Sequence, residues 1–360
     1  MTLVNPYLIS RRKNFFSKLA AHHLDGYLIT SDINIRYLTG FPASESWLLV
    51  SPKKSYYMTD FRYVLEARQG LPGIAVHRYR SSLSKAFGSL ARALRLERIG
   101  FDDRHLSFHA FKRLKNERPA SIKLIAVNGL VEELREIKDA GEINLIRQAL
   151  KLHLEAYRFL KGVIKPGVRE SEVLLQLERF VRDRKVGFAF DPIIASGPNS
   201  CLPHAKITDR KIQPHEPVLV DIGIEVDGYK SDLTRIFFLG TIPHLVRKIY
   251  SAVALAQEKA ITKIQPGVRV ADIDAQARRY LNSQKLGQFF GHSLGHGVGL
   301  EIHEGPRLSS QSSSILKENM VVTVEPAVYL PQKFGIRIED MVLVTAGGCE
   351  VLSGNRNHRD

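Results

Sequence analysis

Short β-rich runs alternate with helix-like patterns along the first 130 residues. The expected strands cover residues 25–30, 46–50, 55–59, 74–79, 98–101 and 122–127. The expected helices cover residues 11–23, 61–69, 81–96 and 105–118. Strands that alternate with helices predict an α/β layer domain. None of these strands is followed by a Gly-rich phosphate loop, so nothing supports nucleotide binding.

The pattern changes at residues 131–160, where apolar residues recur at the spacing of one long amphipathic helix. A chain of 360 residues also exceeds what one hydrophobic core usually organises. We therefore expect two domains, residues 1–135 and residues 136–360.

The second domain contains an internal repeat. The sequence IKPGVR at Ile164–Arg169 returns as IQPGVR at Ile264–Arg269, and each copy precedes a helix-like segment followed by strand-rich sequence. Pro-Gly turns are also common solutions to one geometry, so six residues alone leave coincidence open. We interpret the echo as duplication of a helix-plus-strands unit.

Composition narrows the class of protein. The apolar fraction is 44%, no secretory signal pattern opens the chain, and no run of about 18 apolar residues occurs. We expect a soluble cytoplasmic protein without a membrane partner. Cys201 and Cys349 are the only cysteines, and their spacing resembles no zinc or redox motif, which favours two free thiols in a reducing compartment.

The net charge is +15, and residues 1–135 hold 22 Lys or Arg against 11 Asp or Glu, a surplus of 22 − 11 = +11. These basic residues are dispersed through helical stretches and form no compact run interleaved with aromatics. We therefore expect a solvated basic surface and no nucleic-acid site.

Two aspartates lie in one predicted hairpin. Asp227-Gly228 separates two alternating runs, which is a strong signal for a tight turn. A two-residue turn places Gly223 opposite Asp232 and puts Asp221 on the same face, diagonal to Asp232. We expect the missing side chain at Gly223 to leave room for a shared cation.

A glycine-rich segment downstream contains three histidines, His292, His296 and His303. A single histidine there would more often be structural than a ligand. Three of them in one segment where glycine permits tight turns favour a binding site.

Two further alternating segments, residues 320–330 and 334–344, are expected to be strands, and each places one glutamate among apolar neighbours. Glu325 and Glu339 would be costly to bury without a partner, and a bound metal ion removes that cost. Arg337, two residues before Glu339, faces the same side and could orient a carboxylate.

Asp221, Asp232, His296, Glu325 and Glu339 together offer a mostly oxygen-rich ligand set within about 120 residues. A pair of cations held by such a set can turn a bridging water into hydroxide near neutral pH. The sequence therefore predicts a two-metal hydrolase.

The motifs DIGIEVDGYKSDLTR, HSLGHGVGLEIHE, VEPAVY and IRIED, in this order, make residues 136–356 similar to the pita-bread metallopeptidases. That family includes methionine aminopeptidase, Xaa-Pro aminopeptidase and Xaa-Pro dipeptidase (prolidase). SDINIRYLTGF and MTDFRYVLEA resemble the creatinase-type N-terminal domain of the proline-specific members. The resemblance implies a creatinase-type α/β domain followed by an α+β pita-bread domain with duplicated helix-strand units.

The resemblance also implies a role for each metal ligand. Asp221 would bind one metal ion, Asp232 and Glu339 would bridge both ions, and His296 with Glu325 would complete the second. Glu325 would also relay a proton.

On the substrate side, His204 would assist proton transfer or leaving-group stabilisation, and His303 would contact the scissile carbonyl. His292 and Arg337 would lie on the same side of the site, and Arg307 would hold the free carboxylate of a dipeptide.

Two features depart from the family pattern. The family strand usually reads Glu-Pro-Gly, and this chain has Ala327 in place of the glycine, two residues after Glu325. The loop FPASESW, residues 41–47, lacks a histidine that some prolidases use to close the dipeptide site. The second departure weakens the dipeptidase interpretation more than the peptidase interpretation.

The sequence thus predicts hydrolysis of Xaa-Pro bonds in short proline-containing peptides by a homodimer that uses two divalent ions. Mn²⁺ is favoured among Mn²⁺, Co²⁺, Fe²⁺ and Zn²⁺. An Xaa-Pro dipeptidase is the first interpretation, and an Xaa-Pro aminopeptidase acting on longer peptides is the alternative. A methionine aminopeptidase, a metal-free creatinase and a non-catalytic binding protein are less favoured, because they lack the first domain or the ligand set.

Overall fold

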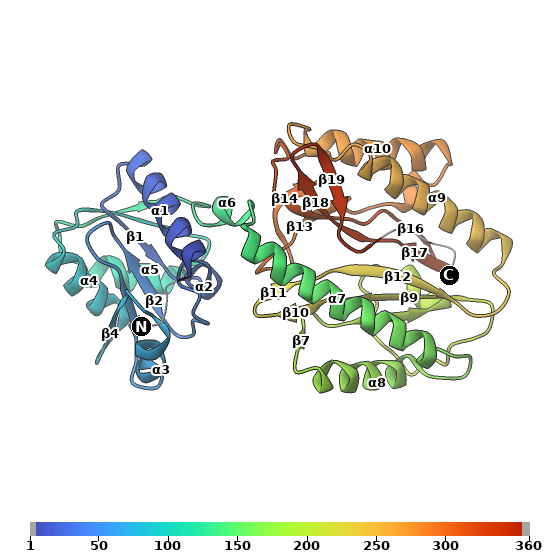
Figure 1. Ribbon diagram of the computed structural model, residues 1–360, viewed down its shortest axis with the longest axis horizontal. Helices are drawn as coiled ribbons and strands as arrows, with labels where there is room; N and C mark the ends of the chain where they lie inside the picture. Colours follow the sequence, from blue (N-terminus) through green and yellow to red (C-terminus); the bar gives the residue numbers. More distant parts are fainter. Residues whose placement is uncertain (1–4, 355–360) are drawn as a thin grey trace. The chain divides into compact units, whose positions relative to one another are not determined.

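The computed structural model describes residues 5–354, and the contacts within the chain divide it into two compact units, Met1–Arg135 and Glu136–Asp360 (Figure 1). Each unit has its own sheets and its own buried apolar core. No helix among the described residues is both long and apolar enough to cross a bilayer.

The N-terminal unit is built on one six-stranded sheet with the order β4-β3-β2-β1-β5-β6. Its strands are β1 (Gly26–Ile29), β2 (Trp47–Val50), β3 (Tyr56–Thr59), β4 (Ala75–Arg78), β5 (Arg98–Phe101) and β6 (Lys123–Ala126). Its helices are α1 (Pro6–Ala21), α2 (Asp32–Thr39), α3 (Val64–Gly70), α4 (Leu83–Ala93), α5 (Phe108–Glu117) and α6 (Glu132–Arg135). All six expected strands and all four expected helices are present, so the alternating pattern predicted this α/β unit correctly.

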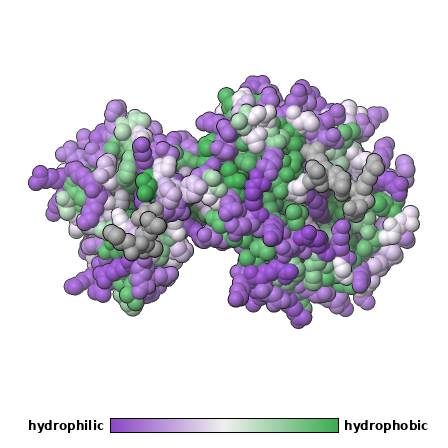
Figure 2. All heavy atoms as spheres, in the orientation of Figure 1, coloured by the Kyte–Doolittle hydropathy of each residue, from purple (hydrophilic) through white to green (hydrophobic). Residues whose placement is uncertain are grey.

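Hydrophilic side chains are spread over the visible surface of the N-terminal unit and form no single stripe (Figure 2).

Helix α2 was missing from the sequence-based expectation. Its ends carry clear signals: the Ser31 side chain accepts a hydrogen bond from the backbone N–H of Asn34, and Gly40 ends the helix at φ 73°. Serine at an N-cap and glycine in the left-handed conformation after the last turn are typical helix boundaries. The helix was overlooked because eight residues are too few to show a clear apolar period.

The C-terminal unit, Glu136–Asp360, has helices outside its strands, with α7 and α8 on one side and α9 and α10 on the other (Figure 1). The helices are α7 (Ala140–Val163), α8 (Glu170–Asp183), α9 (His244–Ile261) and α10 (Val270–Ser283), with short 3-10 helices η1 (Gly197–Cys201) and η2 (Gly287–Phe289). The first strands are β7 (Gly187–Phe188), β8 (Ile193–Ser196), β9 (Pro217–Ile222), β10 (Ile224–Val226), β11 (Tyr229–Lys230) and β12 (Leu233–Phe238). The later strands are β13 (Gly295–Gly297), β14 (Glu304–Leu308), β15 (Val321–Val324), β16 (Ala327–Leu330), β17 (Phe334–Arg337), β18 (Asp340–Thr345) and β19 (Gly348–Val351).

The expectation of a single long helix over residues 131–160 is wrong, because the helical conformation is interrupted between α6 and α7. Asp139 caps α7: its side chain accepts from the backbone N–H of Glu142, and the Glu142 side chain accepts from the backbone N–H of Asp139. This capping box starts a new helix. Lys138, just before the cap, is buried and pairs with Glu304 at 3.1 Å.

The predicted hairpin and its register are confirmed. Val226 pairs with Tyr229 across the Asp227-Gly228 turn, and both turn residues have positive φ, 47° and 81°. Further out, Thr234 pairs with Asp221 in the same register. A two-residue turn with two left-handed residues matches the twist of the strands.

We expected the missing side chain at Gly223 to leave room for a shared cation, and this explanation for the glycine is wrong. A Cβ at this position would lie 2.6 Å from the Phe190 ring and 2.7 Å from the Ser231 carbonyl oxygen. Glycine is therefore needed for close packing of protein groups and does not leave an open space for an ion.

Each strand expected over residues 320–330 and 334–344 is two strands. The chain leaves β15 at Glu325-Pro326 and enters β16, and it leaves β17 at Ile338-Glu339 and enters β18. β15 and β18 belong to a five-stranded sheet, whereas β16 and β17 form a separate two-stranded sheet. Alternation alone cannot show that a continuous pattern passes from one sheet to another.

The repeated Pro-Gly motifs have matching geometry. Gly167 and Gly267 have φ of 88° and 85°, and their N–H groups donate to the carbonyls of Ile212 and Leu316 at 2.8 and 2.9 Å. Each motif leads directly into a 14-residue helix, α8 or α10. The equivalent hydrogen bonds support duplication of this unit.

Candidate metal centre

Three of the five predicted ligands lie between strands, and the other two lie within short strands. Asp232 follows β11, Glu325 follows β15 and Glu339 follows β17, while Asp221 lies near the end of β9 and His296 is the middle residue of β13. At such breaks the side chains leave the alternation of a regular strand. Four separate segments of the C-terminal unit therefore bring acids into one region.

The distances place these groups close together. His296 Nε2 lies 3.6 Å from Asp232 Oδ2 and 3.4 Å from Glu325 Oε1. One ligand atom each from Asp232, His296 and Glu339 lies within 4.8 Å of the others. These separations leave a shared position for a cation between an imidazole nitrogen and carboxylate oxygens.

The electrostatics of this cluster favour a bound cation. Burial first, and repulsion from neighbouring acids second, raise the pKa of Asp232 and of Glu339 well above their ordinary values. Burial also raises the pKa of Glu325 to about 8. Oδ1 of Asp221 is buried without a hydrogen-bond partner among the described residues. A divalent ion relieves both the repulsion and the unpaired oxygen.

The imidazole completes the donor set. Burial, together with the nearby His303, lowers the pKa of His296 to about 4, so the ring is neutral and can donate a lone pair to a metal. Its Nδ1 lies 3.1 Å from the Gly297 carbonyl oxygen, which favours a proton on Nδ1 and leaves Nε2 as the ligand atom. The residues present therefore fit hard or borderline divalent cations.

Two residues beside the ligands orient them. Thr234 donates to Glu339 Oε2 at 2.8 Å and accepts from Arg337 Nε at 2.9 Å. Arg337 also donates to Asp221 Oδ2 at 2.5 Å and to the Tyr329 hydroxyl at 2.6 Å. Arg337 is 4% exposed, so its geometry fits an orienting role better than direct contact with a substrate.

Thr234 and Tyr329 were not singled out from the sequence. The hairpin register contained the signal for Thr234, because it lies directly opposite Asp221. For Tyr329 the sequence held no comparable signal, since its hydroxyl meets Arg337 and His292 Nε2 through the pairing of β16 with β17.

The cluster opens into a cavity of about 1450 Å³, which also contains the predicted substrate-side residues His204, His292, His303 and Arg307. The His303 ring lies 4.4 Å from that of His296. Burial lowers the pKa of His292 to about 4 and also lowers that of His303. Apolar side chains complete part of the wall: Leu174, Phe190, Pro192, Ile193, Ile207, Phe289, Ile302 and Pro331. The cavity can thus accept a small molecule with both apolar and charged parts.

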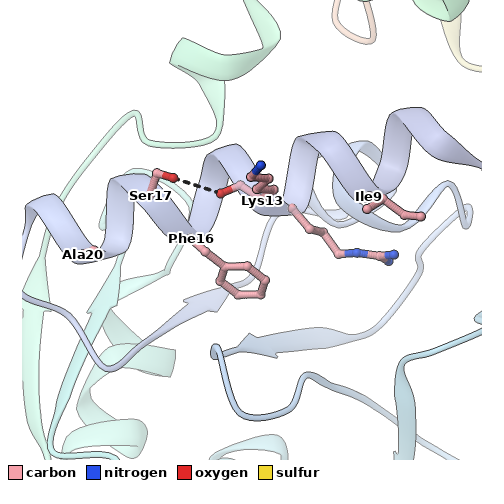
Figure 3. Close-up of a pocket in the computed structure, with 6 residues that line it drawn as sticks. Ile9, Lys13, Phe16, Ser17 and Ala20 are labelled. Carbon is pink, nitrogen blue, oxygen red and sulfur yellow. Dashed lines mark hydrogen bonds between the residues drawn. The ribbon is translucent and has the colours of Figure 1, made fainter.

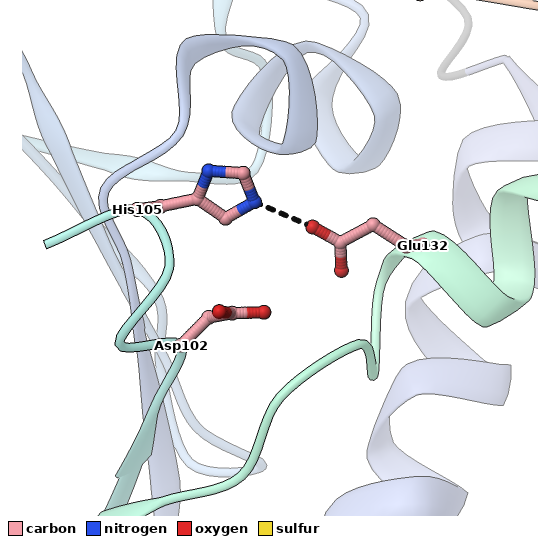
Figure 4. Close-up of side chains that lie close together, drawn as sticks. All are labelled: Asp102, His105 and Glu132. Carbon is pink, nitrogen blue, oxygen red and sulfur yellow. Dashed lines mark hydrogen bonds and ion pairs between the residues drawn. The ribbon is translucent and has the colours of Figure 1, made fainter. Parts of the chain in front are cut away.

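One further hollow and one further cluster of possible ligand atoms lie elsewhere in the described residues. A surface hollow of about 510 Å³ lies along α1, lined by side chains such as Ile9, Lys13 and Phe16 from that single helix (Figure 3). In the N-terminal unit, Asp102, His105 and Glu132 also bring possible ligand atoms within 4.8 Å (Figure 4). Neither place combines a cavity of comparable volume with several buried acids.

Comparison with known proteins agrees with this geometry. Residues 144–346 match the model of metallopeptidase family M24, and residues 11–137 match the creatinase/prolidase N-terminal domain. An uncharacterized peptidase of Bacillus subtilis is 35% identical over 346 residues, which are 96% of this chain and 97% of the relative.

Two solved structures are similar over nearly their whole length. An Xaa-Pro dipeptidase from Bacillus anthracis has a TM-score of 0.92 and 33% identity, covering 97% of this chain and 98% of that one. An X-Pro aminopeptidase from Thermotoga maritima has a TM-score of 0.86 and 34% identity, covering 92% and 96%. The chain therefore belongs to metallopeptidase family M24 and is a hydrolase with a creatinase-type α/β N-terminal domain before a pita-bread catalytic domain.

Proposed function

We propose that this enzyme hydrolyses the Xaa-Pro bond of short peptides, with Xaa-Pro dipeptides as the preferred substrates. The observation that carries the proposal is the convergence of three buried acids, the partly buried Glu325 and His296 in one cavity whose wall also presents His204, His303 and Arg307. That cavity suits a substrate with an apolar ring and a terminal carboxylate.

We assign Asp221 to one metal ion, Asp232 and Glu339 to both, and His296 with Glu325 to the second. Two divalent cations held there would lower the pKa of a water molecule and polarise the scissile carbonyl. Mn²⁺ is our first choice of metal. A homodimer and a cytoplasmic location stay predictions from the sequence.

The protein side chains divide the remaining work. Glu325, with a pKa raised to about 8 by burial, is suited to accept a proton from water and pass it on. His204 and His303 border the cavity and stabilise charge that develops on the substrate. Arg307, which is exposed to the cavity and reaches Ser293 Oγ at 3.3 Å, pairs with the free carboxylate.

The second candidate is an Xaa-Pro aminopeptidase acting on longer peptides. The similarity to the X-Pro aminopeptidase structure favours it as much as the other structure favours a dipeptidase. Among the residues considered, only Arg307 directly favours a substrate with a terminal carboxylate close to the metal centre.

A length series decides between the two. We expect kcat/KM with Mn²⁺ or Co²⁺ to be highest for Ala-Pro and to fall as residues are added after proline. Arg307→Met should raise KM for Ala-Pro by about tenfold or more, the value of one charge-assisted hydrogen bond, and should affect a longer peptide less. A preference for longer peptides would support the aminopeptidase. Metal bound without any proline release would indicate a binding protein.

A further inference from the structure

Two side chains of α7, His153 and Tyr157, contact the hairpin that carries Asp221 and Asp232. His153 and Tyr157 are four residues apart and therefore lie on one face of the helix. His153 is fully buried and Tyr157 is 6% exposed. Their rings are 4.8 Å apart, so they form one packed unit.

These two side chains bind the residues on either side of Asp232. His153 Nδ1 lies 3.0 Å from Ser231 Oγ, and the Tyr157 hydroxyl donates to the Leu233 carbonyl at 2.6 Å. The residue before Asp232 and the residue after it are thus both tied to α7.

The same hydroxyl reaches the strand that carries the other aspartate. Tyr157 Oη lies 3.1 Å from the carbonyl oxygen of Val220, the residue that precedes Asp221. One phenol therefore contacts the backbones of β9 and β12, each time at the residue next to an aspartate.

Asp232 needs such support because its own backbone N–H has only a weak acceptor. It lies between β11 and β12, and its N–H donates to the sulfur of Met341 at 3.2 Å, a weak acceptor. Repulsion from Glu339 and Asp221 acts on its carboxylate at the same time. Without fixed neighbours, Asp232 could move away from the other acids.

The state of the His153 ring agrees with this arrangement. Burial keeps the ring neutral, so it offers one N–H donor and one lone pair. Ser231 Oγ donates to the Ile224 carbonyl at 3.3 Å and accepts from the Ile224 N–H at 3.1 Å, which leaves it able to accept from His153 Nδ1. His153 Nε2 has no partner among the described residues. The ring therefore makes a single side-chain hydrogen bond, and that bond goes to the residue before Asp232.

We propose that His153 and Tyr157 are positioning residues that hold Asp221 and Asp232 at the spacing required to bind metal. The inference rests on the metal centre assigned under the proposed function. It adds that α7, which supplies no ligand, sets the metal affinity through backbone and serine contacts.

Tyr157→Phe removes only the hydroxyl. We expect Mn²⁺ to bind the metal-stripped variant about 10- to 100-fold more weakly, the usual cost of losing a group that orients a ligand, in a calorimetric titration or a chelator competition. At saturating Mn²⁺, KM for the peptide should stay close to the wild-type value. The matched control is Tyr27→Phe, which removes a phenol bond of 2.6 Å to the Val127 carbonyl in the N-terminal unit. Equal Mn²⁺ affinity in the two variants would overturn the proposal.

His153 gives a second, conservative pair. His153→Asn keeps an N–H donor near the position of Nδ1 and should bind Mn²⁺ nearly as the wild type does, whereas His153→Leu should weaken binding as Tyr157→Phe does. Ser231→Ala tests the same contact from the hairpin side if a His153 variant does not fold. Unchanged affinity in His153→Leu or Ser231→Ala would also contradict the proposal.

Asp232→Ala separates the two levels of inference. If this variant binds Mn²⁺ as the wild type does, the metal-centre assignment itself fails. If Asp232→Ala loses Mn²⁺ but the α7 and Ser231 variants do not, only the positioning role is wrong.

Discussion

Two clusters in this protein contain the same three residue types at similar spacing, yet they differ in charge balance. In the N-terminal unit the cluster consists of Asp102, His105 and Glu132. In the catalytic unit it consists of Asp232, His296 and Glu339, called the Asp232 cluster below. In each cluster three possible ligand atoms lie within 4.8 Å of one another. In the first cluster Arg104 lies 2.5 Å from Asp102 and 3.5 Å from Glu132, so a cation from the chain already pairs with both acids.

The ionisation of the acids reflects this difference. Burial raises the pKa of Asp102, but hydrogen bonds from Arg104 and Gly129 outweigh it and leave that pKa below its ordinary value. For Asp232, burial and neighbouring acids act in the same direction and raise the pKa well above its ordinary value. The comparison teaches that donor types and distances do not identify a metal site. What identifies a metal site is acidic charge that the chain's own cations do not fully compensate.

The largest effect should come from removing one acid of each cluster. Glu339→Ala should lower kcat/KM by about 10³-fold or more, because a metal centre supplies several kcal/mol of transition-state stabilisation. Asp102→Ala should leave kcat/KM within about twofold of wild type, since Asp102 is not among the residues that line the cavity. Both are measured with metal content by elemental analysis. A metal-loaded, fully active Glu339→Ala variant would refute the assignment.

The next effect should come from the two arginines. Arg337→Met removes the bond to Asp221 and should weaken Mn²⁺ binding by about 10- to 100-fold. Arg104→Met is the matched change in the other cluster and should leave Mn²⁺ affinity at the catalytic centre unchanged. Titration of the metal-stripped proteins measures both. Equal loss in the two variants would mean that charge at a distance, and not local orientation, sets the affinity.

Arg104→Met should instead affect stability. The variant leaves Asp102 buried with one fewer charged donor, but the Arg104 side chain is 50% exposed and partly screened. We expect the free energy of unfolding to fall by about 1–2 kcal/mol. Thermal unfolding detects this, and an unchanged melting temperature would show that the N-terminal ion pair contributes nothing measurable.

The last effect concerns pH and His153, the buried neutral residue that supports the aspartates of the metal centre. Burial lowers the pKa of His153 well below 6.5, so below that pH the unfolded chain binds a proton that the folded protein does not. Stability is therefore lost as pH falls below 6.5, by about 1.4 kcal/mol per pH unit. His153→Asn should lose less stability than wild type between pH 7 and pH 5, as compared by urea unfolding of metal-stripped protein. Parallel losses would show that His153 titrates normally.

Local pattern predicted much of the fold because neighbouring residues carry its signal. The strands of the N-terminal unit and the register of the Asp227-Gly228 hairpin follow from side-chain alternation and turn chemistry. Helix α2 could also have been found from its caps, Ser31 and Gly40. The break before α7 was readable in principle from Asp139 and Glu142, but the amphipathic period continued across it.

For the site, the residue types and their order were enough to identify Asp221, Asp232, His296, Glu325 and Glu339 as candidates. Their convergence was not readable from spacing, because it depends on strands that leave one sheet for another. Thr234, Tyr329 and the α7 pair have ordinary sequence surroundings, and their contacts span up to about 105 residues.

What the amino-acid sequence determined by itself was the local alternation, the turns and the supply of acids and histidines, since each depends on residues close along the chain. The tertiary structure alone decided which acids remain without a compensating cation, because that balance depends on segments that meet only after folding. Arg104 pairs with the acids of one cluster, while in the other Asp232 is buried beside further acids that repel its charge, and a metal ion can relieve that repulsion.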